Sequence, residues 1–540
     1  MTLDQDLQSM QEARDLVKRA HEAYLEYKQF TQAQVDTIVE AMARAGFDNA
    51  ERLAKMAHEE TGFGRWQDKV VKNVFSTKHV WESIKDLKTV GMVRSYKNGA
   101  VIEIAEPMGV VAALVPCTNP TSTAMYKAII ALKGRNAIVA SPHPRSVKST
   151  TECLRVLDEA AVKAGAPKGL IHCMQHVSRE GTTELMQQKR TAVILATGST
   201  AMVRAAQSVG KPAFGVGAGN VPAFIERTAN VKKAVADVMT GKKFDNGVLC
   251  STEASVIVDS PVYDEARELV KQHGGFFCEG EDKDKLRRTV FPGGHLNSEL
   301  VGKPATFIAQ QAGIQCPPET AVLVAEIDKV GRDEPLSREK LSPVLSMFKA
   351  DGWLAGCHRC IELLEFGGIG HTMAIHSSDK EVVMKFALEK PAQRVVVNSV
   401  ASVGAVGYTN ELAPSLTLGP GTIGGSIISE NVTAEHLVNV KRVAFETKPM
   451  NDERGSALPQ DTQLRWGNST PASRTRDEGQ ERRSWMKEIE ERIRDRAGNP
   501  AIGNKPQQPA AKPEVKSGVV LGAGITAEEV QKIISEFSLK

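Results

Sequence analysis

The chain has 540 residues, is 41% hydrophobic and 25% charged, and carries a formal net charge of only +3. This composition is ordinary for a globular protein, and without a long run of like charge it argues against nucleic acid as a partner. The eight cysteines show no disulfide-framework spacing and no apolar stretch is long enough for a bilayer, so we expect a cytoplasmic protein without a membrane partner.

The predicted elements alternate along most of the chain. Residues 4–58 show helical periodicity. Short apolar runs then alternate with helical segments over 100–225, and a second such series runs through 250–398. This alternation is typical of βαβ units on a parallel sheet. We therefore predict an α/β fold with two Rossmann-like domains, over 1–225 and 226–425, and a cleft between them.

The composition changes after about residue 447. Residues 448–517 are rich in charge, Pro and Gln, which is typical of a flexible linker. Residues 518–540 regain helical character, because Thr526-Ala527-Glu528-Glu529 is a capping box that precedes an apolar stripe at i, i+3, i+4 and i+7. The stripe consists of Val530, Ile533, Ile534 and Phe537. We predict a flexible C-terminal extension that ends in an amphipathic helix.

The most informative segment is 244–253, in which Cys250 follows the Asn246-Gly247 turn and precedes an apolar run. A turn with free backbone N–H groups can lower the pKa of a thiol and can hydrogen-bond an oxyanion, as attack on a carbonyl group requires. A cysteine that simply opens a buried strand is equally compatible with this spacing.

Two further segments directly follow predicted strands. Asn119 comes after the apolar run 109–115, so its amide is predicted at the carboxyl end of a parallel strand, where it could donate to an oxyanion. The alternative is an ordinary Asn-Pro turn. Residues 196–200, with the sequence Ala-Thr-Gly-Ser-Thr, open a predicted helix and suit a dinucleotide pyrophosphate. The alternative is a simple N-cap by Ser199 or Thr200.

The glycine-rich segment 367–376 contains His371, whose imidazole can take a proton at neutral pH, although a loop histidine without a role is the alternative. Two other motifs are weaker. The segment 419–424 fits the dinucleotide pattern G-x-G-x-x-G, but its proline is awkward for that turn. Cys357 and Cys360 form a single CxxC in a predicted helix, which favours buried thiols, and we predict no metal site.

Taken in chain order, these segments resemble the aldehyde dehydrogenase superfamily over about residues 10–447. The resemblance rests on Asn119, Thr197-Gly198-Ser199, the glycines of 215–220, Cys250, Glu339-Lys340-Leu341-Ser342-Pro343 and 367–372. The segments 244–250, 370–372 and 418–426 are similar to the coenzyme A-acylating members of the ethanolamine- and propanediol-utilisation type. The resemblance implies NAD as cofactor and coenzyme A as co-substrate. It also implies a homodimer or homotetramer built through a strand-bearing arm, near 87–104 and 432–446.

The resemblance also implies roles for single residues. Cys250 is the nucleophile, Asn119 and the Cys250 backbone N–H form the oxyanion hole, and His371 assists the coenzyme A thiol. The implied cofactor-binding residues are Thr118, Ser141, His143, Thr197, Gly198, Ser199, Gly215, Val216, Gly217, Glu339 and Pro343. Hydrolytic members carry a Glu-Leu-Gly-Gly-Lys motif whose glutamate activates water, but the matching stretch 215–219 has no carboxylate. A thioester on Cys250 is therefore expected to await the coenzyme A thiol and to release acyl-CoA reversibly.

The expected substrate is a short-chain aldehyde, because small residues near Ser426, Ile427 and Ile428 resemble the family's substrate-lining segment. Propionaldehyde is favoured over acetaldehyde. A hydrolytic dehydrogenase that makes the free carboxylate and a non-catalytic shell adaptor are the alternatives. The helix at 525–540 resembles the peptides that dock enzymes to bacterial microcompartment shells, which predicts shell proteins as partners and a location inside a microcompartment. A helix that folds back onto its own protein is the alternative.

Overall fold

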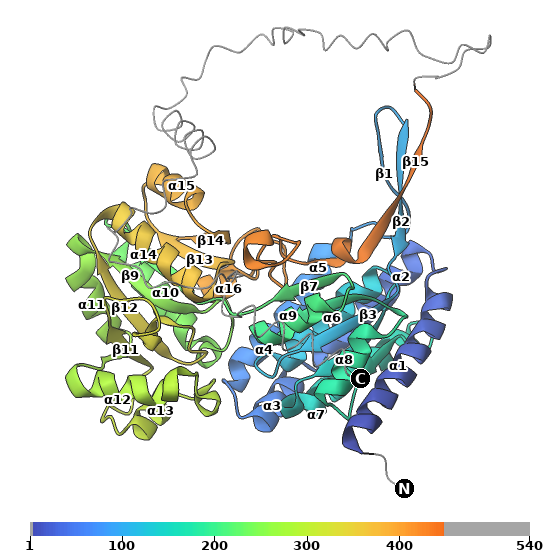
Figure 1. Cartoon of the computed structure of the whole chain (residues 1–540). Coiled ribbons are helices and arrows are strands. Elements are labelled where there is room, and N and C mark those ends of the chain that lie inside the picture. Colours follow the sequence, from blue (N-terminus) through green and yellow to red (C-terminus); the bar gives the residue numbers. More distant parts are fainter. Residues whose placement is uncertain (1–3, 448–540) are drawn as a thin grey trace, which may run out of the picture. The chain divides into compact units, whose positions relative to one another are not determined.

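The computed structural model describes residues 4–447, which belong to one compact unit. The linker over 448–517 and the helix over 518–540 that the sequence predicts lie outside the described residues. Three sheets organise the described part, namely two parallel sheets of five and seven strands and an antiparallel sheet of three (Figure 1). The predicted α/β fold with two parallel sheets is confirmed. Within residues 4–447, every helix is too short or too polar to cross a bilayer.

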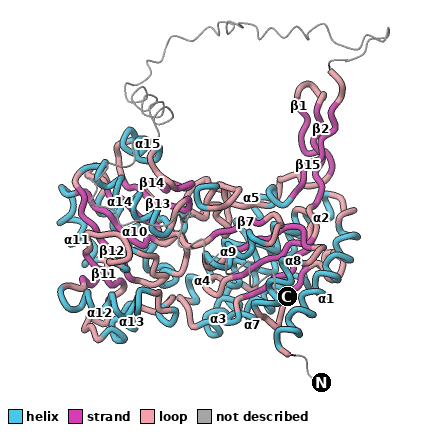
Figure 2. Tube along the Cα trace, in the orientation of Figure 1, coloured by secondary structure: helices cyan, strands magenta, loops and turns pink. Residues whose placement is uncertain are grey.

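The first parallel sheet has the strand order β5-β4-β3-β6-β7. Its strands are β3 (Val110–Val115), β4 (Ala137–Pro142), β5 (Ile171–Cys173), β6 (Thr191–Thr197) and β7 (Ala213–Val216). Its helices are α1 (Gln5–Tyr27), α2 (Gln32–Asp48), α6 (Pro120–Lys133), α7 (Val147–Lys163), α8 (Arg179–Gln187) and α9 (Thr200–Ser208). Helices lie over the sheet in Figure 2, and β3 and β4 are buried along their whole length as a result.

Three shorter helices precede the first strand. They are α3 (Ala50–Thr61), α4 (Trp66–Val74) and α5 (Val80–Ile84), and a single π turn, Phe75–His79, joins the last two. Helix α4 contacts α6 of the first sheet and also the short 3-10 turn Phe244–Gly247, which precedes Cys250. The N-terminal helices therefore reach the segment that carries the predicted nucleophile.

The second parallel sheet has the order β10-β11-β12-β9-β8-β13-β14. Its strands are β8 (Val221–Ile225), β9 (Glu253–Asp259), β10 (Gly275–Phe277), β11 (Val322–Glu326), β12 (Val344–Ala350), β13 (Gly370–His376) and β14 (Ala392–Val397). Its helices are α10 (Val231–Lys243), α11 (Tyr263–Gln272), α12 (Gly280–Val290), α13 (Ala305–Ala312), α14 (Gly352–Gly367), α15 (Lys380–Leu388) and α16 (Ala401–Gly404). Cys357 and Cys360 are buried in α14, as a pair of packed thiols would be.

The predicted domain boundary at 225/226 is wrong. Strand β8 ends at Ile225, but it lies between β9 and β13 of the second sheet, so that sheet begins at Val221. Local sequence patterns do not indicate this assignment, because β7 and β8 are two short apolar strands separated by only the glycine-rich residues 217–220. Which of two sheets a strand joins depends on partners that lie far away in the chain.

The third sheet is antiparallel and separate from the other two (Figure 1). Strand β2 (Val101–Pro107) lies between β1 (Gly91–Tyr96) and β15 (Val438–Ala444). Its pairing with β15 runs from Val438 opposite Pro107 to Ala444 opposite Val101. The two segments predicted to form an arm are thus hydrogen-bonded to each other, although they lie near opposite ends of the described chain.

Candidate active site

The strand order of the five-stranded sheet reverses between β3 and β6, which is where a ligand crevice is expected. Strands β3 and β6 are neighbours, while the chain moves outward from β3 through β4 to β5 and from β6 to β7. Ligands bind at such a switch point, beyond the carboxyl ends of the two central strands. Thr118 and Asn119 follow β3 there, and Thr197, Gly198 and Ser199 end β6 and lead into α9. The structure therefore brings two of the predicted segments to one edge.

Helix α9 starts close to β7 because two positions lack a side chain. A Cβ atom on Gly215 would lie 2.5 Å from Val203 Cγ1, and one on Gly217 would lie 3.3 Å from Thr200 Oγ1. The Ser199 hydroxyl accepts a hydrogen bond from the Met202 backbone N–H at 3.3 Å, so the N-cap interpretation holds for Ser199. The cap does not exclude a phosphate, since other N–H groups of the first turn stay free to donate.

Cys250 lies beside Glu339 and His371, and Gly219 is a neighbour of all three residues. The Gly219 N–H donates to Glu339 Oε1 at 2.9 Å. A Cβ atom on Gly219 would lie 1.9 Å from the Cys250 carbonyl oxygen and 3.2 Å from His371 Nδ1, so only glycine fits. Burial raises the pKa of the Glu339 carboxyl to about 7, against the lowering effect of the hydrogen bond from Gly219.

The Cys250 thiol is half-buried in the loop between the 3-10 turn Phe244–Gly247 and β9. Burial, followed by the nearby Glu339 carboxylate, raises the pKa of this thiol to about 12. Arg394 and the backbone N–H groups of Cys250 and Ser251 act in the opposite direction. The turn favours the thiolate, as expected, but the effect of burial on the pKa is larger. The thiol is therefore protonated at neutral pH.

His371 is buried near the start of β13. Its Nδ1 lies 3.0 Å from Thr372 Oγ1, and its Nε2 is buried without a hydrogen-bond partner. Burial, helped by Arg394, lowers the pKa of His371 to about 3, so the imidazole is neutral at pH 7. Arg394 on β14 donates to the carbonyl oxygens of His371 and Gly419, at 2.8 and 2.7 Å. A neutral imidazole with a free nitrogen can accept a proton, but only from an acid held close to it.

The loop before Cys250 has an unusual backbone. Asp245, Asn246 and Gly247 all have positive φ, at 47°, 51° and 72°. Such residues persist only where their surroundings hold them, and they gather at functional sites. Here the Asp245 N–H donates to Asp68 Oδ2 at 2.8 Å, and Asn246 Nδ2 donates to the Gly302 carbonyl at 2.9 Å.

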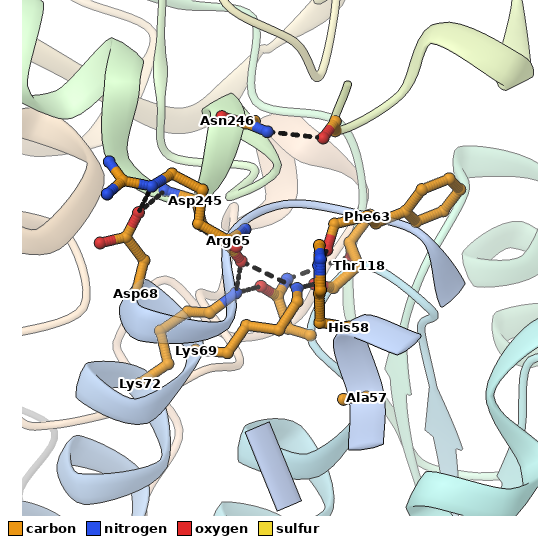
Figure 3. Close-up of polar contacts among 12 residues, drawn as sticks. Ala57, His58, Phe63, Arg65, Asp68, Lys69, Lys72, Thr118, Asp245 and Asn246 are labelled. Atoms are coloured by element: carbon orange, nitrogen blue, oxygen red, sulfur yellow. Dashed lines mark hydrogen bonds and ion pairs between the residues drawn. The ribbon is translucent and has the colours of Figure 1, made fainter. Parts of the chain in front are cut away.

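Asp245 also holds two buried lysines of α4 (Figure 3). Lys69 Nζ lies 3.0 Å from Asp245 Oδ2, and Lys72 Nζ donates to the same oxygen. Lys72 Nζ further donates to Asn119 Oδ1 at 2.6 Å. Sequence reasoning missed both lysines and Asp68. Their only signal is the spacing of Lys69 and Lys72 on one helical face, which is ordinary for a solvated surface.

Three other predicted cofactor-binding residues make hydrogen bonds within the protein. Ser141 is buried and its hydroxyl lies 2.8 Å from Thr182 Oγ1, whereas His143 is exposed and accepts from the Arg145 N–H at 3.1 Å. Pro343 is buried, and its carbonyl accepts from the Leu323 N–H at 2.9 Å. Their proposed contacts with a cofactor remain predictions.

An apolar pocket lies next to the nucleophile loop. It is lined by Val71, Lys72, Phe75, Phe244, Leu249, Val403, Val406, Tyr408 and Leu416. None of the residues expected to line a substrate site, 426–428, belongs to it, and Ile427 is 85% exposed. Leu249 directly precedes Cys250 in the chain, but Cys250 itself does not line this pocket.

Comparisons with known proteins show which family the chain belongs to. Residues 4–281 match the aldehyde dehydrogenase family. The chain belongs to this family. The solved structure of an acetylating aldehyde dehydrogenase from Geobacillus thermoglucosidasius superposes with a TM-score of 0.82 at 47% identity, covering 84% of this chain and 100% of that one.

Other aldehyde dehydrogenases are also similar. The bifunctional aldehyde-alcohol dehydrogenase of Escherichia coli K12 is 44% identical over 81% of this chain, which spans 49% of that protein, so the chain spans about half the length of this curated relative. The acetylating succinate-semialdehyde dehydrogenase of Clostridium kluyveri is 38% identical, over 81% of this chain and 96% of its own length. A propionaldehyde dehydrogenase from a Clostridium phytofermentans microcompartment has a TM-score of 0.72 at 27% identity, covering 79% and 96% of the two chains.

Proposed function

We propose that the chain is an NAD-dependent, coenzyme A-acylating aldehyde dehydrogenase that converts a short apolar aldehyde to acyl-CoA. The observation that carries the proposal is the surroundings of Cys250, which lies against Gly219 with Glu339 and His371 as neighbours. Residues 215–219, at the end of β7 and in the loop after it, contain only glycine, valine and alanine where a hydrolytic enzyme needs a carboxylate. The acylating relatives among the similar proteins support the same reaction.

The switch-point crevice fits a dinucleotide. Thr197, Gly198 and Ser199 would hold the pyrophosphate at the start of α9, and Glu339 would hold the nicotinamide ribose. Gly215 and Gly217 keep space beside that helix, since a Cβ atom at either position would press on it. When bound, NAD supplies the hydride acceptor of the reaction.

The protein's own groups perform the remaining chemistry. The Cys250 thiol releases its proton to solvent, and the sulfur then adds to the aldehyde carbonyl carbon. The Asn119 amide donates to the resulting oxyanion. After oxidation, the acyl group remains on Cys250 as a thioester. The sulfur of coenzyme A then attacks the acyl carbon, and the Cys250 thiolate leaves. His371 Nε2, which has no other hydrogen-bond partner, relays the proton of the incoming thiol to the Cys250 thiolate, whose pKa is the higher of the two.

The pocket beside Leu249 supports an apolar substrate. Eight of its nine lining residues are aliphatic or aromatic, and the ninth, Lys72, already donates to Asp245 and Asn119. A free lysine would favour an anionic aldehyde such as succinate semialdehyde, but a neutralised one offers little attraction. The similarity to an acetylating enzyme at 47% identity supports acetaldehyde as the preferred substrate, whereas the sequence analysis favoured propionaldehyde.

The deciding experiment measures NADH formation from acetaldehyde with and without coenzyme A, and identifies the product by mass spectrometry. An acylating enzyme forms acetyl-CoA and depends on coenzyme A for turnover. Cys250→Ala is the control, and we expect it to reduce turnover by about 10⁴-fold or more while NAD still binds, because no nucleophile remains. Rapid formation of acetate without coenzyme A would identify a hydrolytic enzyme instead.

The substrate class is tested with two four-carbon aldehydes, one of them anionic. We expect kcat/KM for butyraldehyde to exceed that for succinate semialdehyde, because the carboxylate would be desolvated in an apolar pocket without a free cation. Acetaldehyde and propionaldehyde differ by one methylene, worth about 1–3 kcal/mol, and are compared in the same series. A preference for the anionic aldehyde contradicts this part of the proposal.

We further propose that the arm formed by β1, β2 and β15 joins subunits in a homo-oligomer, and that residues 525–540 bind a microcompartment shell protein. The support for the second proposal is the capping box at 526–529 and the apolar stripe that follows it. Deletion of 518–540 should leave specific activity unchanged and abolish co-purification with shell protein. Loss of activity would favour a helix that packs on the enzyme itself.

A further inference from the structure

Asn119 occupies the N-cap position of α6, yet its side chain makes no capping hydrogen bond. Asparagine is among the best N-cap residues, because its carbonyl oxygen accepts from the first turn of the helix. Here Oδ1 instead accepts from Lys72 Nζ at 2.6 Å, and Nδ2 donates to Thr118 Oγ1 at 3.1 Å. The Asn119 side chain therefore does not cap α6 and instead makes hydrogen bonds with Lys72 and Thr118.

The lysine fixes which way the amide faces. An ammonium group has three donors and no acceptor, so it can pair only with the carbonyl oxygen of an amide. The NH₂ group of Asn119 must then face the opposite way. An oxyanion hole needs this orientation, because only the NH₂ group can donate to an oxyanion.

Lys72 is itself held by the nucleophile loop. The Lys72 and Asp245 side chains are only 5% and 0% exposed, and they are joined by a direct ion pair. Asp245 lies five positions before Cys250 in the same loop. The ion pair of Asp245 and Lys72 thus connects the nucleophile loop to the Asn119 amide, which follows β3 on the other sheet.

Lys69 and Lys72 share the carboxylate of Asp245. The Asp68 carboxylate adds a weaker attraction for Lys72, while its own ion pair is with the exposed Arg65 at 3.7 Å. Burial lowers the pKa of Lys72 to about 8, and the Asp245 carboxylate opposes that shift. Only the ammonium form is restricted to the carbonyl oxygen of Asn119, because a neutral amine could also accept from the NH₂ group. The pair with Asp245 therefore keeps Lys72 charged in a site that would otherwise favour its neutral form.

We propose that Lys72 is a positioning residue, which orients the Asn119 amide toward the oxyanion and acts only through that amide. The inference rests on the proposed function, because it presumes that Asn119 stabilises the adduct on Cys250. Asp245 is the second component, since it ties Lys72 to the loop that presents the thiol.

The chain offers a matched control in Lys69. It lies on the same face of α4, is equally buried, and donates to the same Asp245 oxygen at 3.0 Å. Its other hydrogen bond goes to the Thr118 carbonyl at 3.2 Å, whereas the hydrogen bond to Asn119 comes from Lys72. A lysine that merely stabilises the loop and a lysine that orients the amide can therefore be compared within one cluster.

The test is a double-mutant cycle between Lys72→Met and Asn119→Ala, with kcat/KM for acetaldehyde as the readout. We expect Lys72→Met alone to lower kcat/KM by about 10–100-fold, which is less than the 10²–10³-fold loss typical of removing an oxyanion donor. The double variant should be no slower than Asn119→Ala, because the lysine has nothing left to orient. Lys69→Met should have a smaller effect that multiplies with that of Asn119→Ala.

Full multiplicativity of Lys72→Met and Asn119→Ala would overturn the inference, as would an unchanged kcat/KM in Lys72→Met. If Lys72→Met does not fold, Lys72→Arg and Lys72→Gln replace it. Arginine also only donates and should retain most activity, whereas glutamine can offer a carbonyl to a flipped Asn119 and should lose it. Equal activity of these two variants contradicts the inference.

Failure of the proposed function is recognised separately. If the wild-type enzyme needs no coenzyme A, or if Asn119→Ala keeps full activity, the proposed function or the oxyanion role is wrong whatever Lys72→Met does. If Asn119→Ala is slow and Lys72→Met is not, only the positioning role of Lys72 fails. The rate at which iodoacetamide alkylates Cys250 reports on the loop. We expect Lys72→Met to change this rate less than threefold, because Lys69 still pairs with Asp245 in that variant. A larger change would assign the lost activity to a displaced loop and overturn the positioning role.

Discussion

The two parallel sheets contribute to the active site by different means. On the five-stranded side, the start of α9 is positioned by residues that are near one another in the sequence. They are the Ser199 cap and two glycines that let α9 lie close to β7. On the seven-stranded side the nucleophile loop is held by buried charges from α4. Asp68 and Lys72 lie 177 and 173 positions before Asp245. Glycine and a cap leave a surface free for ligands, whereas buried ion pairs fix a strained loop in one conformation.

Asp245→Asn is expected to cause the largest loss of stability, because it removes the carboxylate that pairs with the buried lysines of α4. It leaves Lys69 and Lys72 buried without their carboxylate, and removing one partner of a buried ion pair costs about 3–5 kcal/mol. The urea midpoint of unfolding should fall, and activity should fall with it. Asp259→Asn is the control, because Asp259 is equally buried but its partner Arg227 is 45% exposed and can turn to solvent. An equal loss of stability in both variants would contradict the expectation.

Gly215→Ala tests the cofactor side. The added methyl would come within 2.5 Å of Val203 and push α9 away from β7. We expect the KM for NAD to rise about tenfold, equivalent to ~1.4 kcal/mol of binding, with little change in kcat at saturating NAD. Gly217→Ala, whose methyl would lie 3.3 Å from Thr200 Oγ1, should have a smaller effect. The expectation is wrong if kcat falls and KM does not.

Two charged residues should tune the Cys250 thiol in opposite directions, measured by the rate of alkylation with iodoacetamide. Because the pKa of the thiol is raised to about 12, the rate should increase about tenfold for each pH unit between 7 and 9. Glu339→Gln should accelerate alkylation at pH 8, since the carboxylate raises the pKa. Arg394→Met should slow it. A plateau below pH 8, or the same sign for both variants, contradicts this electrostatic account.

The last prediction concerns how the stability of the protein depends on pH. Burial raises the pKa of Glu253 from 4.5 to about 7, so the folded state binds more protons between these values and stability falls as pH rises through that window. Glu253→Gln keeps an acceptor for the Ala401 N–H, which bonds to Oε1 at 2.6 Å, and removes the titration. Its free energy of unfolding, measured with urea, should match the wild type near pH 4.5 and exceed it by about 1–3 kcal/mol near pH 8. Parallel pH curves for the two proteins would exclude the assigned pKa.

The sequence predicted what local patterns encode. Alternation of apolar runs with helices indicated two parallel sheets, and the residues after β3 and β6 indicated a switch-point crevice. The N-cap at Ser199 was named as one of two alternatives. Boundaries were less certain, since β8 joined a different sheet from the one expected. The Lys69, Lys72 and Asp245 cluster could not be predicted, because it depends on a contact between α4 and a distant loop, and an isolated lysine pair is ordinarily solvated.

One glycine in this cluster has a consequence for variation of the protein. A Cβ atom on Gly64 would lie 1.9 Å from Asp245 Oδ1, and Gly64 has a φ of +68°. Any larger residue at position 64 must therefore displace the carboxylate that Lys69 and Lys72 require. In a library randomised at both positions, tolerated residues at 64 should depend on the residue at 245, so that the two sites are selected as a pair rather than one at a time.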